Sequence, residues 1–347
     1  MLAEVFVAWA LPQPDYAIRL SPWGWEHLNS ISYHHAPGSK ESIVDVRYNS
    51  QGFRNSREFS KKKPEDTLRI AILGDSEAEG SHVGSEYSAG KVLEGLVTQH
   101  LSTQYPGSFN RVEVINAGVY GYDPCQYLQL FLNRVQELQP DIVMIVHFNA
   151  LASDNYCTYG ADKVSAKKMI YSRLEYLIHW STNYATAKSH LLRYVHRASR
   201  KLVGATVASP NKLNKFMVTY SPPELSEQRL ADYSPDPIDS FVIPFDPNGM
   251  GTFLSQEHEQ TWLIFREFGK IAEESRMKLW VLFGNTADGL QPFMKKLQSE
   301  GMNLFDLGQY LVAHKESPVQ FRAGHLNEYG NLLMGRALFD LVMLEID

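Results

Sequence analysis

The sequence predicts an α/β protein with about five parallel strands that are covered by helices on both faces. Three observations predict this class. Short apolar runs alternate with helical patterns in two regions of the chain. The runs are apolar throughout instead of alternating with polar residues, which is typical of strands buried on both faces. Regularity also stops for a long stretch between the two regions, which indicates one core interrupted by an insertion.

The first region follows a polar linker and ends near residue 146. Pro140 ends its second helix because proline cannot continue a helical ladder. The expected elements are, in order, a strand at 68–73, a helix at 89–101, a strand at 112–116, a helix at 125–138 and a strand at 142–146.

The second region runs from residue 257 to the end of the chain. Its expected elements are a helix at 257–274, a strand at 278–283, a helix at 290–299, a short strand at 303–305 and a helix at 328–344. We therefore predict an irregular N-terminal segment at 1–60 that packs on the core, a core formed by 61–155 and 256–347, and an insertion at 156–255 that serves as a lid.

The composition narrows the class of function. The chain has 347 residues, is 44% hydrophobic and carries a formal net charge of −6, which argues against nucleic acid as its main partner.

Cys125 and Cys157 are the two cysteines. They form no metal-binding spacing, and we expect two buried thiols, although one bridge is possible. We expect no cofactor. No run of 18 apolar residues is present, so we expect no membrane-spanning segment in this sequence.

The first half of the insertion is basic, and aromatic and aliphatic residues are interleaved with its cations over residues 163–201. A basic amphipathic helix can lie on an anionic membrane surface. The alternative, which we favour, is a solvated helical lid over the site. Nothing in the sequence indicates an oligomeric state.

The first candidate site residue is Ser76, in the turn Gly74-Asp75-Ser76 directly after the strand at 68–73. In open α/β sheets, sites form outside the carboxyl ends of the strands, and this turn places a hydroxyl there. Gly80 fits a backbone that passes close to a bound group. Ser76 is therefore the candidate nucleophile, and it needs a base to accept its proton.

His325 is the leading candidate for that base. It lies just ahead of the last expected helix, so a serine early in the chain and a histidine late in it suggest nucleophilic acyl chemistry. His147 ends the strand at 142–146 at the same expected edge, so it is a candidate for the lining of the pocket.

An acyl-transfer site also needs hydrogen-bond donors aimed at the developing oxyanion. The backbone N–H groups of Ser76 and Gly118 are candidates, because Gly118 follows a strand and opens a loop. The side chain of Asn149, just after the strand at 142–146, is the third candidate.

Together these motifs resemble the SGNH (GDSL-type) hydrolase superfamily, in the branch whose members open with an Asn-Ser-x-Gly-Phe-Arg segment. The resemblance implies a flavodoxin-like three-layer α/β/α sandwich and ester hydrolysis or acyl transfer, often on acylated sugars or lipids. It implies Ser76 as nucleophile, His325 as base and Gly118 as oxyanion donor, and a location outside the cytoplasm, such as the periplasm. The matching segments are residues 49–54, 74–80, 112–122, 140–143 and 324–330.

The chain departs from the family pattern before the histidine. The family usually carries an aspartate two or three residues ahead of it, but here Ala323 and Arg322 occupy those places. Loss of the orienting carboxylate can lower the rate by up to about 10⁴-fold. Asp306 and Asp75 are candidate supporting carboxylates.

A second departure lies in the asparagine segment. Aligning residues 149–155 with the family tail puts Ala150 at the position of the oxyanion asparagine, with Asn149 one place early. Removing one oxyanion donor costs about 10²–10³ in rate.

We therefore expect a serine esterase that acts on an acylated sugar, a lipid or a small ester through an acyl-enzyme on Ser76. Two alternatives remain open: an O-acyltransferase that uses the same acyl-enzyme, and a catalytically silent binding protein with this fold. In an active enzyme, Ser76 Oγ and a ring nitrogen of His325 should lie within hydrogen-bond reach.

Overall fold

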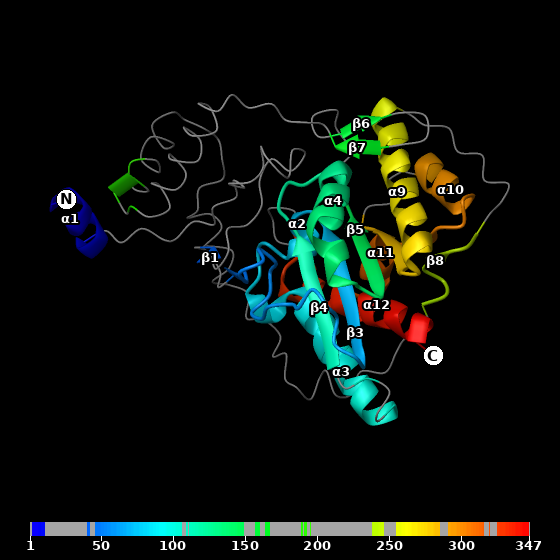
Figure 1. Cartoon of the computed structure of the whole chain (residues 1–347), viewed down its shortest axis with the longest axis horizontal. Coiled ribbons are helices and arrows are strands. Elements are labelled where there is room, and N and C mark those ends of the chain that lie inside the picture. The colour runs from blue at the N-terminus through cyan, green and yellow to red at the C-terminus, as the bar shows by residue number, and fades with distance from the viewer. Residues whose placement is uncertain are drawn as a thin grey trace.

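The protein folds as a three-layer α/β/α sandwich (Figure 1). The computed structural model describes residues 2–10, 40–41, 46–105, 109, 111–148, 157–159, 164–166, 189, 191–192, 195, 238–245, 255–284, 291–315, 319 and 325–346. No helix in these ranges is long and apolar enough to cross a membrane.

The central sheet has six strands in the order β4-β3-β5-β9-β10-β8. The first five run parallel and β8 pairs antiparallel with β10, so the prediction of about five parallel strands is confirmed. Numbered along the chain, the five lie in the flavodoxin-like order 2-1-3-4-5, which reverses between β3 and β5. The strands are β3 (Thr67–Gly74), β4 (Arg111–Gly118), β5 (Ile142–His147), β8 (Val242–Ile243), β9 (Lys278–Phe283) and β10 (Asn303–Phe305).

Helices cover both faces because the strands are apolar on both sides. In β3, Ile70 and Ile72 pack into one core and Ala71 and Leu73 into the other. In Figure 1, α9 and α10 lie side by side, and they cover the face opposite to α12. One face carries α3 (Ala89–Gln104), α11 (Leu307–His314) and α12 (Glu328–Ile346), and the other carries α4 (Pro124–Leu130), α9 (Gln256–Ser275) and α10 (Gln291–Gln298).

The helix expected over residues 125–138 is not uniformly α-helical. After α4, the chain continues as a π-helix, η2 (Phe131–Val135), and a 3₁₀ turn, η3 (Gln136–Leu138). Gln139 then adopts a left-handed conformation with a φ of 55°, directly before Pro140. Proline disfavours the α region for the residue before it, which explains why the helix ends here.

The range predicted as irregular contains short elements. They are α1 (Leu2–Ala10) and a two-strand pair, β1 (Lys40–Glu41) with β2 (Val46–Arg47). The α1 sequence holds three alanines and no glycine or proline, which favours a helix. Periodicity misses this helix because its residues are almost all apolar. Most of this segment, and most of the insertion predicted at 156–255, lies outside the described residues, so their boundaries stay predictions.

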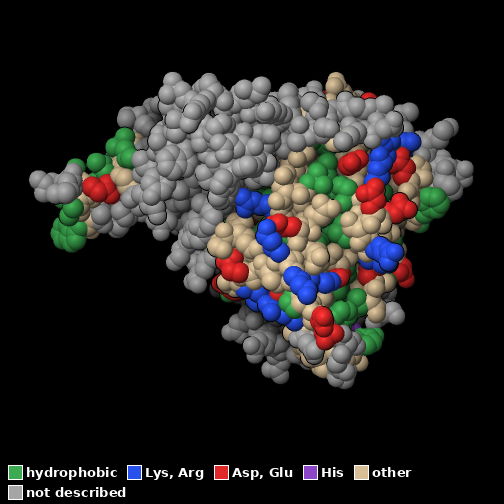
Figure 2. Space-filling view, viewed as in Figure 1, with side chains coloured by type: hydrophobic (Ala, Val, Ile, Leu, Met, Phe, Trp, Pro, Cys, Tyr) green, Lys and Arg blue, Asp and Glu red, His purple; other side chains and the backbone are tan. Residues whose placement is uncertain are grey.

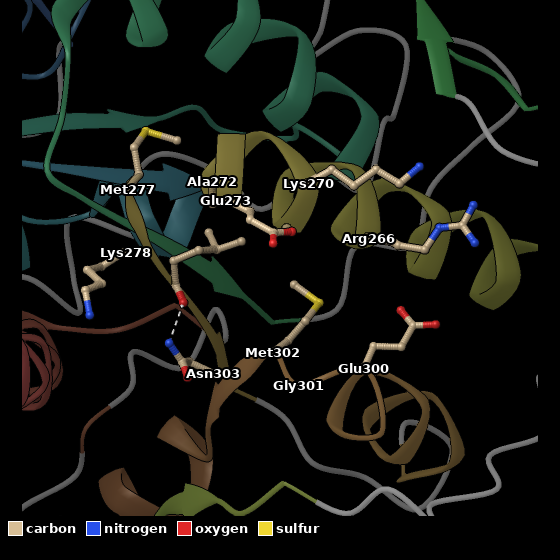
Figure 3. Close-up of a pocket in the computed structure, with 12 residues that line it drawn as sticks. Arg266, Lys270, Ala272, Glu273, Met277, Lys278, Glu300, Gly301, Met302 and Asn303 are labelled. Atoms are coloured by element: carbon tan, nitrogen blue, oxygen red, sulfur yellow. Dashed lines mark hydrogen bonds between the residues drawn. The ribbon is translucent and has the colours of Figure 1, made fainter. Parts of the chain in front are cut away.

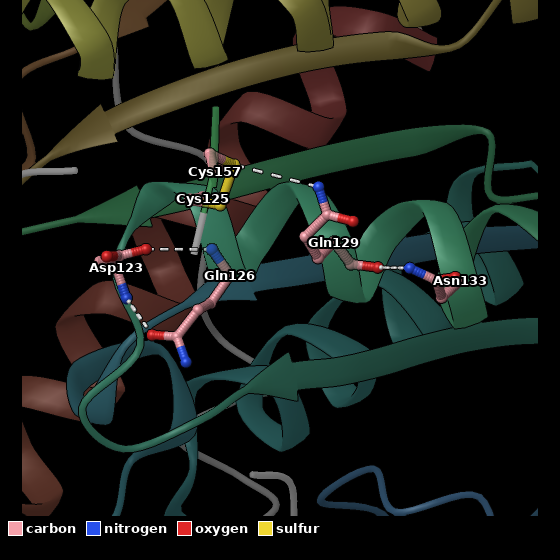
Figure 4. Close-up of a disulfide and its surroundings, with 6 residues drawn as sticks. All are labelled: Asp123, Cys125, Gln126, Gln129, Asn133 and Cys157. Atoms are coloured by element: carbon pink, nitrogen blue, oxygen red, sulfur yellow. Dashed lines mark hydrogen bonds between the residues drawn. A yellow bond between two sulfur atoms is a disulfide. The ribbon is translucent and has the colours of Figure 1, made fainter. Parts of the chain in front are cut away.

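The two cysteines form a disulfide, so the expectation of two free thiols is wrong (Figure 4). Cys125 lies in the first turn of α4, and Cys157 begins β6 (Cys157–Tyr159), which pairs with β7 (Val164–Ala166). Their Cα atoms are 5.9 Å apart, within the usual span of a disulfide. Sequence alone cannot reveal this bond, because it depends on where β6 lies relative to α4.

Candidate active site

Ser76 lies where the strand order reverses. β3 ends at Gly74, whose φ of 151° favours glycine, and a Cβ there would meet the Val146 carbonyl oxygen of β5 at 2.4 Å. Asp75 then caps the short helix α2 (Ser76–Glu79) by accepting the Glu77 N–H at 2.9 Å. Ser76 is therefore the first residue of a capped turn at the carboxyl edge of the sheet.

The structure brings His325 to Ser76 across 249 residues of sequence. His325 Nε2 lies 2.9 Å from Ser76 Oγ, within the reach needed for proton transfer. Just after His325, the Asn327 side chain accepts the Gly330 N–H at 2.8 Å at the start of α12. Ser76 is thus the first residue of α2, and His325 lies three residues before α12 begins.

Two further rings stack near the His325 imidazole. The His82 ring lies 4.1 Å from it, centroid to centroid, at an interplanar angle of 30°. The Tyr120 ring lies at 6.2 Å and 19°, and Tyr120 is 42% exposed. Sequence reasoning missed both residues. Their positions in the sequence were the signal that could have found them, because His82 lies six residues after Ser76 and Tyr120 lies two residues after Gly118.

Two carboxyl groups flank Ser76, of which Glu77 is buried and Asp75 is half-buried. Burial, with a smaller effect of the Glu79 charge, raises the pKa of Asp75 to about 6, although the hydrogen bond from the Glu77 N–H lowers it. Burial raises the pKa of Glu77 to about 8, opposed by the hydrogen bond from the Leu326 N–H and reinforced by the charge of Asp75. Perturbed carboxyl groups of this kind gather at functional sites.

The segment at 49–54 supports the turn that follows α2. The buried Arg54 guanidinium donates to the carbonyl oxygens of Glu79, Gly80 and Val83. These interactions fix the end of α2 from outside the sheet. The Asn-Ser-x-Gly-Phe-Arg motif therefore has a structural role here that its sequence alone does not explain.

Glu79 connects α2 to the loop that holds Tyr120. Its buried carboxylate accepts the Tyr48 hydroxyl at 2.5 Å and the Tyr120 N–H at 2.8 Å. Glu79 therefore fixes the backbone from which the Tyr120 ring extends beside His325.

The candidate oxyanion donors differ in their surroundings. The Gly118 N–H donates to Asn116 Oδ1 at 3.1 Å, so this donor is engaged within the chain. A Cβ on Gly118 would lie 2.2 Å from the Glu79 nitrogen, so β4 and α2 approach closely here. The Ser76 N–H opens α2, where the first N–H groups have no partner in the helix. Asn149 lies outside the described residues.

The structure places the remaining candidates in other roles. Asp306 caps α11 by accepting the Gln309 N–H at 2.8 Å. His147 is fully buried, and its ring packs edge-on against Phe265 and Phe283. Burial, with a smaller effect of nearby His258, lowers the pKa of His147 to about 4. The alternation of side chains along β5 places His147 in the core beneath α9, so the expectation that it lines the pocket is wrong.

A separate pocket of about 350 Å³ lies at the opposite edge of the sheet, where β9 and β10 begin (Figure 3). Side chains of both charges line it, among them Arg266, Lys270 and Glu300. Figure 3 shows these three side chains extending from α9 and from the turn before β10. This pocket is distinct from the Ser76 site, which lies at the carboxyl edge.

Comparison with known proteins gives weak matches to esterases. No family model and no curated protein matches the sequence. A two-domain esterase active on acetylated mannans shows 11% identity and a TM-score of 0.36, over 81% of this chain and half of that one. A protein described as lipolytic and of the G-D-S-L family, from Desulfitobacterium hafniense, shows 10% and 0.36, over 78% of this chain and 98% of that one. An acetylxylan esterase from Geobacillus stearothermophilus, in a catalytic mutant, shows 11% and 0.36, over 80% and 94%.

At these identities and TM-scores, the matches do not establish the chemistry of this chain. The strand order of this chain and the placement of its motifs can instead be compared directly with what the resemblance implies. The five parallel strands have the expected flavodoxin-like order, and the serine and histidine segments meet at the expected edge. The structure thus agrees, in fold and in the placement of these two motifs, with the resemblance to the SGNH hydrolases.

Proposed function

We propose that this protein is a serine-dependent esterase that acts on an acylated sugar, a lipid or a small ester. The observation that carries the proposal is the 2.9 Å separation between Ser76 Oγ and His325 Nε2 at the carboxyl edge of the sheet. This pairing supplies the nucleophile and the base that acyl transfer requires.

The reaction would proceed in two stages through an acyl-enzyme. Ser76 Oγ attacks the ester carbonyl carbon while His325 Nε2 accepts the hydroxyl proton. The tetrahedral intermediate then collapses, the bond to the alcohol breaks, and His325 returns the proton to the leaving alkoxide. Water attacks the acyl-enzyme in the same way, releases the acid and restores Ser76.

The negative charge on the carbonyl oxygen needs donors in both stages. We assign this role to the N–H of Ser76, with Gly118 and Asn149 as further donors. The Gly118 N–H can contribute only after it leaves Asn116 Oδ1. This requirement links oxyanion binding by Gly118 to a rotation of the Asn116 side chain within β4.

Turnover of p-nitrophenyl acetate and longer-chain p-nitrophenyl esters tests the proposal. We expect kcat/KM to fall by about 10³-fold or more in Ser76→Ala and in His325→Ala, because either change removes the activated nucleophile. Ser102→Ala, an exposed serine of α3, is the matched control and should keep the wild-type rate. Equal rates in wild type and Ser76→Ala would contradict the proposal.

The same assay separates hydrolysis from acyl transfer. Adding an acceptor alcohol or sugar diverts the acyl group to a new ester if the acyl-enzyme prefers a hydroxyl over water. An ester product that exceeds the free acid would identify an O-acyltransferase. No turnover and no acyl-enzyme would favour a silent binding protein.

A further inference from the structure

We propose that Glu77 is a positioning residue for His325 and stands in for the aspartate that the histidine segment lacks. It does so by accepting a backbone N–H of that segment. The inference rests on the proposed function, because it assigns a role in the same Ser76 and His325 chemistry.

The contact joins the two catalytic segments one residue beyond each reacting side chain. Glu77 follows Ser76, Leu326 follows His325, and Glu77 Oε2 accepts the Leu326 N–H at 3.0 Å. Both residues are buried, with Glu77 only 7% exposed. A hydrogen bond in such surroundings is costly to break, because it leaves a buried polar group unpaired.

Other bonds fix the backbone that follows His325. The Asn327 N–H donates to the Val319 carbonyl oxygen at 3.1 Å, and the Asn327 side chain accepts the Gly330 N–H. Both bonds join the segment to residues that are close to it in the sequence. The bond from Leu326 to Glu77 instead attaches it to α2, the helix that carries Ser76.

This arrangement matters because proton transfer tolerates little misplacement. A shift of about 1 Å at a reacting group can cost about 10²-fold in rate. The His325 ring is placed by Ser76 and by the stacked His82 ring. Glu77 adds control of the backbone from which that ring extends.

Glu77 therefore acts differently from an aspartate that bonds the imidazole. Its role needs an acceptor oxygen and does not need a negative charge. The raised pKa of about 8 agrees with this, since a neutral carboxyl still offers its carbonyl oxygen to the Leu326 N–H. A glutamine at this position keeps that oxygen, whereas a leucine keeps a similar volume without it.

The test is the rate of covalent labelling by a fluorophosphonate, read by intact mass, together with kcat and KM on a p-nitrophenyl ester. We expect Glu77→Leu to lower the labelling rate and kcat by about 10²-fold, with KM changed much less. Glu77→Gln should stay within a few-fold of the wild-type values.

Gln126→Leu is the matched control for loss of a buried acceptor. Gln126 is also buried, and its Oε1 accepts the Asp123 N–H at 3.1 Å in a different loop. Its loss should lower the melting temperature and leave the labelling rate unchanged.

Three outcomes would overturn the inference. Glu77→Leu labelled at the wild-type rate would show that the bond does not position His325. Equal losses in Glu77→Leu and Glu77→Gln would show that charge, not the acceptor oxygen, matters. A wild-type protein that resists labelling would overturn the proposed function itself, and the role of Glu77 with it.

Discussion

At the residue scale, burial controls the carboxyl groups beside Ser76. Asp75 and Glu77 lie in one short turn, and burial is the main cause that raises the pKa of each. The charge of Glu79 adds to the rise for Asp75, and the charge of Asp75 adds to the rise for Glu77. The turn thus holds two acids near the nucleophile with pKa values above those of ordinary carboxyl groups. This has a consequence for stability.

The contribution of Glu77 to the free energy of unfolding should fall as the pH rises from about 4.5 to about 8. The unfolded chain releases the Glu77 proton near 4.5, whereas the folded protein keeps it to about 8, so the unfolded state binds fewer protons in this window. The stabilisation that Glu77 contributes is therefore full below this window and is lost as the pH rises through it. Urea unfolding at a series of pH values measures the slope.

Glu77→Gln removes this ionisation. The variant should unfold with a flatter pH dependence than the wild type, and it should gain on the order of a few kcal/mol relative to the wild type above pH 8. The same slope in both proteins would contradict the raised pKa of Glu77.

Single residues show what the sequence could and could not reveal about the site. Ser76 and His325 could be predicted because each lies next to a recognisable strand or helix. The contact between Glu77 and Leu326 could not, since it depends on how two distant segments meet. The expectation for His147 is wrong because a strand end predicts the edge of the sheet but not which core the last side chain enters.

At the element scale, close packing of α12 against α3 makes Gly335 a sensitive position. A Cβ on Gly335 would lie 2.6 Å from the Val92 Cβ, whereas a Cβ on Gly269 in α9 would meet only the end of the Met302 side chain at 4.0 Å. Both glycines lie inside helices, so the same substitution changes helix propensity equally and differs in packing.

Gly335→Ala should therefore destabilise the protein by about 1–3 kcal/mol through overpacking. Gly269→Ala, the matched control, should stabilise it by about 0.5–1 kcal/mol, because alanine favours the helix. Chemical denaturation of both variants measures the difference. Equal changes in stability would show that α12 and α3 are not this closely packed.

Element length explains which parts of the fold could be predicted. The long strands and helices of the core follow from their apolar patterns. The short helix α2 and the edge strand β8 do not, because two to four residues carry no measurable period. β8 also comes from the range predicted as insertion and joins the sheet only through pairing with β10.

At the scale of the whole molecule, the disulfide ties part of the predicted insertion to the core. It links α4 to β6 across 32 residues. Disulfides persist in oxidising compartments. The location outside the cytoplasm that the family resemblance implies stays a prediction. Over the described part of the face in Figure 2, Lys and Arg side chains are interspersed with Asp and Glu, so this face carries no single-sign field.

Reduction should lower the free energy of unfolding by about 2–4 kcal/mol, because the reduced chain gains conformational freedom when unfolded. Thermal unfolding with and without dithiothreitol measures this loss. The double variant Cys125→Ala with Cys157→Ala is the control, and its melting temperature should not respond to the reductant. A wild-type protein that is equally insensitive would contradict the disulfide.

The most direct test of the central claim is fluorophosphonate labelling of the purified protein, with the adduct located by peptide mapping. An activated Ser76 should give one adduct, on the peptide that contains Ser76, and the Ser76→Ala variant should give none. Labelling of another residue, or no labelling under conditions that modify an active serine esterase, would contradict the assignment of Ser76 and His325 as a catalytic pair.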